Sequence, residues 1–247
     1  MSSPETPVIP PLPRARELAA GTSDSEAARS APPLPGPATL SEVFGSARDG
    51  AAIAFTLAQL PAGGAVLWVQ DRMSVLETGR PYGPGLADYG RAPEELILAC
   101  GRGAADVLWT MEEGLACDTL TAVIGEVWGD PCELSFTATK RLVRRAERSG
   151  VHACLVRWNG RAGLSAARRR WRVAALPSQP HPWDARAPGL PRWQVELFRA
   201  QGRAPGTWEA RYEPAAHRLH LDAPFRDGAL DPAAERGGDV VPLRRAG

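Results

Sequence analysis

Short apolar runs alternate with longer segments of helical spacing between residues 41 and 158, and this alternation restricts the fold more than any other pattern. The apolar runs are bounded by Gly or Pro and are too short for helices, so they suit buried strands. The segments between them repeat apolar residues every three or four positions, as amphipathic helices do. Strands that alternate with helices form βαβ units and a mostly parallel sheet. The predicted strands are 41–44, 65–69, 94–99, 120–124 and 152–158, the predicted helices are 51–60, 104–115 and 133–149, and 79–90 is a predicted loop.

The pattern changes after residue 170. Four strand-like segments follow one another without a helix between them, and we expect tight turns to join them. Consecutive strands of this kind pair antiparallel. We therefore predict an α/β fold in which a mostly parallel twisted sheet, flanked by helices, carries a C-terminal antiparallel extension. The four additional strands are 171–176, 192–200, 207–212 and 218–221.

Both ends of the chain differ in composition from the middle. Residues 1–38 are rich in Pro, Ala, Ser and Glu, and residues 223–247 in Gly, Pro and Arg. Such segments bury too little apolar surface to offset the entropy lost on ordering. We predict a disordered Pro-rich N-terminal arm over 1–38, one domain over 39–222, and a disordered C-terminal tail over 223–247.

The sequence also bears on location. No apolar run reaches the roughly 18 residues that a membrane-spanning helix requires, and the acidic, Pro-rich start is unlike a signal peptide. The cysteines form no CxxC pair and match no zinc or disulfide spacing. We expect buried, reduced thiols, a cytoplasmic location and no membrane contact. The cysteines are Cys100, Cys117, Cys132 and Cys154.

A glycine-bounded loop stands where a phosphate-binding loop belongs, between the first strand and the first helix. Gly45 and Gly50 have the G-x-x-x-x-G spacing of such loops, which continue with Lys and then Ser or Thr. The lysine neutralises the β- and γ-phosphates and the hydroxyl holds Mg²⁺, but Ala51 and Ala52 occupy these positions. Asp49 adds a negative charge. We predict a degenerate loop; a plain turn before a helix, or residual nucleotide binding through backbone N–H groups, are the alternatives.

The acid that orders the metal in such sites should follow the strand 120–124. Gly125 stands there instead, and Glu126 comes next as a shifted alternative ligand. No other set of residues suggests acid–base, nucleophilic or metal chemistry. We therefore expect no catalytic residue, no metal, no cofactor and no enzymatic activity.

The charges are segregated along the chain. Residues 104–139 contain acids and no basic residue, whereas residues 140–172 contain eleven basic residues and one acid, Glu147. A basic surface with an aromatic residue can bind single-stranded DNA or an acidic partner. A solvated basic turn with Trp171 in the core is the alternative, and self-association of acidic and basic faces is a further hypothesis. The predicted contact residues are Lys140, Arg141, Arg144, Arg145, Arg168, Arg169, Arg170, Trp171 and Arg172.

Several motifs, in order, resemble those of the ImuA family. They are GR-x-YGPGL at 79–86, W-x-MEEGL at 109–115, TATKRL at 137–142, WRVAALPS at 171–178 and PRW at 191–193. The resemblance runs from about Leu40 to Leu221. It implies a RecA-like fold and a place in damage-induced (SOS) mutagenesis and DNA repair.

The same resemblance implies partners. They are an ImuB-like relative of Y-family polymerases, RecA, and indirectly an error-prone replicative-type DNA polymerase. The expected function is therefore that of a non-catalytic accessory protein of translesion synthesis. A weak RecA-like ATPase and a SulA-like inhibitor of the division protein FtsZ are the alternatives.

Overall fold

A computed structural model describes residues 36–224 except residues 182 and 185. The predicted arm over 1–38 and tail over 223–247 lie almost wholly outside the described residues. The described part of the chain holds no helix long and apolar enough to cross a bilayer.

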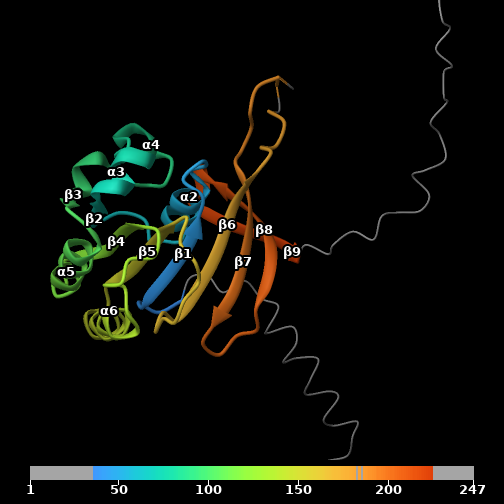
Figure 1. Cartoon of the computed structure of the whole chain (residues 1–247). Coiled ribbons are helices and arrows are strands. Elements are labelled where there is room, and N and C mark those ends of the chain that lie inside the picture. Colours follow the sequence, from blue (N-terminus) through green and yellow to red (C-terminus); the bar gives the residue numbers. More distant parts are fainter. Residues whose placement is uncertain (1–35, 182, 185, 225–247) are drawn as a thin grey trace, which may run out of the picture.

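One nine-stranded sheet organises the described residues, in the order β3-β2-β4-β5-β1-β6-β7-β8-β9 (Figure 1). Every neighbouring pair from β3 to β6 is parallel, and the pairs from β6 to β9 are antiparallel. The predicted α/β class, with a mostly parallel sheet and an antiparallel extension, is therefore confirmed. The strands are β1 (Leu40–Gly45), β2 (Ala65–Asp71), β3 (Leu96–Gly101), β4 (Leu120–Trp128), β5 (His152–Trp158), β6 (Arg169–Leu176), β7 (Arg192–Ala200), β8 (Gly206–Glu213) and β9 (Arg218–Pro224).

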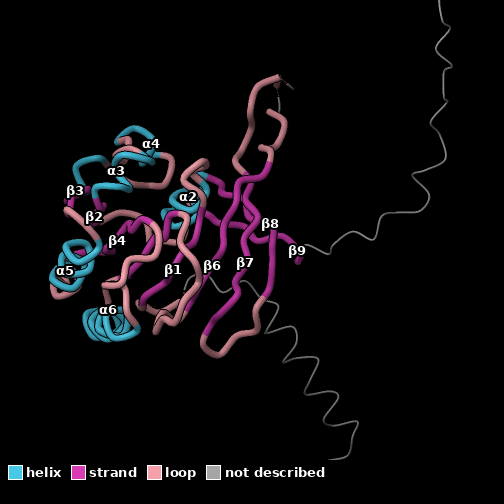
Figure 2. Tube along the Cα trace, in the orientation of Figure 1, coloured by secondary structure: helices cyan, strands magenta, loops and turns pink. Residues whose placement is uncertain are grey.

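Helices cover the two faces of this sheet unequally. One face packs against α2 through Phe55 and against Leu86 of α4, and its core continues over β6, β7 and β8. The other face packs against α5 and α6 around Met111 and Leu142. Figure 2 shows the helices gathered toward β1–β5, with the antiparallel strands extending to one side. The helices are α2 (Ala51–Ala58), α3 (Arg72–Thr78), α4 (Gly83–Ala87), α5 (Ala104–Gly114) and α6 (Phe136–Ser149), and two 3₁₀ turns are η1 (Pro93–Glu95) and η2 (Pro214–Ala216).

Local chemistry explains where α6 begins and ends. The Ser135 hydroxyl accepts a hydrogen bond from the Ala138 N–H at 3.2 Å, so it caps the first turn. Gly150 ends the helix at φ 78°, a left-handed conformation that glycine adopts without strain. The helix is therefore three residues shorter at its start than the predicted 133–149.

Two connections differ from the sequence-based expectation. The predicted loop 79–90 contains the short helix α4, whose first turn includes Pro84. The connection between β6 and β7 is no tight turn: its described residues, 177–191 without 182 and 185, project from the sheet as an arm (Figure 1). Proline lacks the N–H that a strand ladder needs, and the described residues of this arm form one isolated bridge, between Pro180 and Pro188.

The prediction of four buried thiols was wrong. Only Cys154 is buried, on the central strand β5, whereas Cys100, Cys117 and Cys132 are exposed, and all four are free. Cys100 lies on an edge strand and the other two lie in connections beside α5 and α6. A small apolar side chain tolerates either environment, so spacing alone does not fix its burial.

Helix α5 lies close to β4 because Gly125 has no side chain. A Cβ at this position would lie 2.2 Å from the Met111 sulfur, and Met111 is fully buried. We expect Gly125→Ala to lower the free energy of unfolding by about 1–3 kcal/mol, because the core must shift to admit a methyl group. Gly163→Ala is the control, since a Cβ there meets no atom within 4 Å. Urea unfolding measures both, and equal stability of the two variants would contradict this packing.

Candidate functional site

The glycine-bounded loop lies at the carboxyl end of β1, directly before α2, as predicted. Ala51 and Ala52 are buried, with 3% and 0% of their surface exposed. Their methyl groups pack into the core under the sheet. The two positions therefore supply packing and offer neither a charge nor a hydroxyl to a phosphate.

Side-chain oxygens of the loop accept hydrogen bonds from backbone N–H groups of the loop and of the helix start. Asp49 Oδ1 accepts the N–H of Ala51, the first residue of α2, at 3.0 Å. The Ser46 hydroxyl oxygen accepts the N–H of Arg48 at 3.1 Å. Free N–H groups at a helix start are what normally hold a phosphate. Here a carboxylate of the chain itself stands at that helix start and would repel an anion.

Strand β4 extends beyond the predicted 120–124, and this separates Gly125 from Glu126. Gly125 faces Met111 of α5, so an acid there would point into the core. Glu126 faces the side of α2 and is 1% exposed. Its two oxygens accept the indole N–H groups of Trp68 at 2.5 Å and Trp158 at 2.6 Å. Both oxygens of the carboxyl are thus engaged by protein donors.

Burial governs the charge of Glu126. Removal from water raises the pKa of this carboxyl above its usual value, and the hydrogen bonds from Trp158 and Trp68 act in the opposite direction. Among the described residues, no three His, Cys, Asp or Glu side chains gather as metal ligands would. The arrangement stabilises a buried polar group; it does not present a free carboxylate to a cation.

A cleft of about 400 Å³ opens above these residues, at the carboxyl ends of the strands. Asp49 and Gly50 line it on one side, and Tyr82, before α4, on the other. Trp68, Gln70 and Trp158 at its base escaped the sequence analysis. The alternation of side chains along β2 could have indicated them, because Trp68 and Gln70 lie on the same face of the strand. Gln70 also lies in register with Glu126 on β4.

The basic residues of α6 divide into two groups. Arg141 Nε lies 2.7 Å from Glu112 of α5, and Arg145 donates to the Glu112 carbonyl at 2.9 Å. The acidic segment is thus partly neutralised within the same chain. The second group has no ion pair or hydrogen bond within the described residues. Its members are exposed and spaced four residues apart, on one side of the helix. Its members are Lys140, Arg144 and Arg148.

Residues 168–172 do not form one basic surface. Arg168 precedes strand β6 and the other four residues begin it, so the side chains of 169–172 alternate between the faces of the sheet. Trp171 is fully buried, which confirms its core placement and corrects its assignment as a contact residue. Arg168 pairs with Glu147 at 2.8 Å, and Arg172 with Glu196 at 2.9 Å. Arg169 is half-buried, and burial lowers its pKa.

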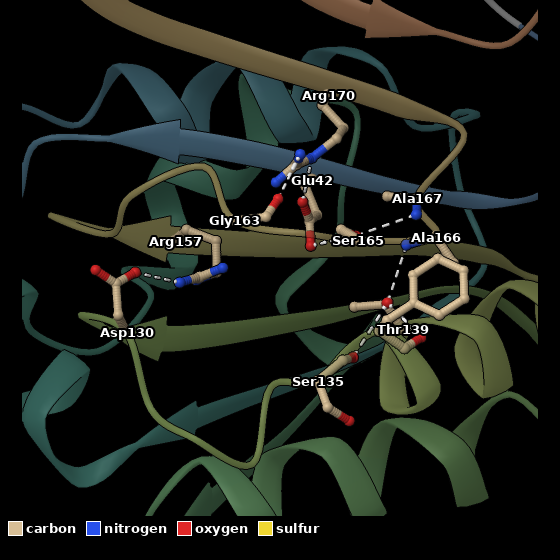
Figure 3. A network of polar contacts seen from close by, with 11 residues as sticks. Glu42, Asp130, Ser135, Thr139, Arg157, Gly163, Ser165, Ala166, Ala167 and Arg170 are labelled. Atoms are coloured by element: carbon tan, nitrogen blue, oxygen red, sulfur yellow. Dashed lines mark hydrogen bonds and ion pairs between the residues drawn. The ribbon is translucent and has the colours of Figure 1, made fainter.

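Arg170 belongs to a buried polar network (Figure 3). It is 4% exposed, and its Nε lies 2.6 Å from Glu42, which is fully buried. Ser165 also donates to Glu42, at 2.8 Å, and Arg170 donates to the Gly163 carbonyl at 2.9 Å. The guanidinium lies 5.3 Å from the Phe44 ring. The network fixes the loop before β6 against the sheet, so Arg170 is structural and is also corrected as a contact residue.

Two curated sequences named Protein ImuA, from two strains of Caulobacter vibrioides, are each 34% identical to the chain over 174 residues. The match covers 66% of this chain and 66% of each relative, so the chain spans about two thirds of their length. No protein-family model matches the chain.

The two arginines of the 168–172 segment provide a matched test of burial. We expect Arg170→Met to lower the free energy of unfolding by about 3–5 kcal/mol, because the buried Glu42 would lose the cation that is hydrogen-bonded to it. Arg168→Met should cost less than about 1 kcal/mol, since its partner Glu147 is 40% exposed and water replaces the lost pair. Urea denaturation of both variants checks this. Similar losses at the two sites would show that the Glu42 pair is not the stronger constraint.

Proposed function

Because the chain belongs to the ImuA family, we propose that it is a non-catalytic accessory protein of damage-induced translesion DNA synthesis. It acts in the cytoplasm through contacts with an ImuB-like relative of Y-family polymerases and with RecA. An error-prone replicative-type DNA polymerase is an indirect partner, which these two proteins connect to this chain. The fold contributes a rigid surface to this assembly and no chemical step.

One observation carries the proposal that the protein does not turn over ATP. Asp49 occupies the N–H of the first residue of α2, where a nucleotide phosphate would bind in a RecA-like site. The lysine and hydroxyl are absent from the two following positions, and Glu126 is held by two indole groups. The loop between β1 and α2 therefore serves as a connection within a RecA-like domain.

Unpaired charge on α6 supports the proposed mode of action. Lys140 and Arg144 project into solvent without a carboxylate partner in the described part of the chain. Exposed cations steer an acidic partner and fix its orientation. We assign the first contact with a partner protein to this side of α6. Arg168 and Arg172, each already paired with a carboxylate, remain predicted secondary contacts.

The absence of ATP turnover is directly measurable. Isothermal titration with ATP and Mg²⁺ should give no heat of binding, and no phosphate release should exceed that of buffer. Asp49→Ala removes the carboxylate at the helix start and serves as a matched variant. It should still release no phosphate, because the lysine and hydroxyl are missing. Tight ATP binding with phosphate release by the unmodified protein would instead support the ATPase alternative.

Partner binding tests the side of α6. We expect Lys140→Ala/Arg144→Ala to weaken binding to the ImuB-like protein or to RecA roughly tenfold, because two unpaired steering charges are lost. Arg199→Ala/Arg218→Ala, at exposed positions on β7 and β9, is the control with equal loss of charge. Biosensor titration measures the affinities. If both double variants bind like the unmodified protein, α6 is not the contact.

A further inference from the structure

The two outer strands of the sheet differ in how they are protected. The edge strand β9 carries Arg218, His220 and Asp222 and ends at Pro224, features that prevent another strand from pairing with it. The edge strand β3 has the sequence LILACG, with no charge and no proline. Its only strand neighbour in the described chain is β2. Its outer N–H and C=O groups therefore remain open to another strand.

The side chains of β3 are also unusually exposed for their type. Ile97 is 52% and Leu98 is 39% exposed, although both are large and apolar. On α3, which contacts β3, Leu76 is 65% exposed. Figure 1 shows β3 at the outer limit of the sheet, beside α3 and α5. An open, apolar edge of this kind is a typical site for strand addition.

The charges that flank β3 identify the added strand. Glu94 precedes the strand and has no ion pair or hydrogen bond in the described residues. Arg102 follows it, with a side chain that is 95% exposed and makes only a solvent-screened contact to Asp106 at 3.2 Å. The edge thus has an acid at one end and a base at the other, so it is complementary to itself when reversed.

We propose that β3 pairs antiparallel with β3 of a second copy of this chain, joining two sheets across a two-fold axis. The axis passes between Leu98 of one copy and Leu98 of the other, which lie opposite each other. Leu96 then lies opposite Cys100, on the same face of the joined sheet. At each end Glu94 of one copy lies near Arg102 of the other. Both patches are identical, as a closed two-fold interface requires.

The full-length protein is examined by sedimentation equilibrium over a range of concentrations at low salt. The unmodified protein should show a reversible monomer–dimer equilibrium. Glu94→Arg and Arg102→Glu should each weaken dimerisation roughly tenfold, because like charges then meet at both ends. The double variant Glu94→Arg/Arg102→Glu should recover the affinity. Leu98→Lys, which places two ammonium groups on the axis, should abolish the dimer.

Each outcome decides the proposal. A monomer at every concentration overturns it, and so does a dimer whose affinity is unaffected by Glu94→Arg and Arg102→Glu. Failure of the double variant to recover overturns the antiparallel register. Because both charged side chains are exposed, these variants fold even if Leu98→Lys does not, and thermal melting confirms that. Arg199→Glu, remote from β3 in the sheet, is the charge control and should leave the dimer intact.

Discussion

The Glu42–Arg170 ion pair lies where the two halves of the sheet join. Glu42 is on β1, the strand of the parallel part that lies next to β6. Arg170 is on β6, from which the antiparallel part continues through β7 to β9. Both side chains are enclosed, so neither can be left alone without a large desolvation cost. Because Ser165 and Gly163 bond to the same pair, the loop before β6 has one position. The position of this loop determines which side chains of β6 point to each face of the sheet.

The carboxyl end of β1 adjoins the cleft that is lined by Asp49 and Gly50. A short connection leads from the strand into α2, and the cleft opens at the carboxyl ends of the strands. The groups around it, however, satisfy one another: Asp49 the helix start, and Trp68 and Trp158 the carboxyl of Glu126. The polar groups of this site are therefore bonded to one another, whereas Lys140, Arg144 and Arg148 on α6 have no ion pair within the described residues.

The sequence predicted the positions of strands and helices better than the burial of individual polar and aromatic side chains. Apolar periodicity predicted the nine strands and the helices α2, α5 and α6, because it records which face is buried, but it did not predict the short helices α3 and α4. Trp171 and Arg170 were harder, since their burial depends on pairing with β1 and on Glu42, more than a hundred residues away. The indole pair around Glu126 likewise comes from two strands that only the sheet order brings together. The exposed cysteines carried no periodic signal at all.

If the β3 edges pair as proposed, the ratio of dimer to monomer depends on the abundance of this protein. A pairing edge responds to mass action: few copies remain single, and many copies join. In a cell that produces the protein in bursts, the fraction of dimer would rise and fall with the amount made. The rate of synthesis would then set how much of the protein is paired.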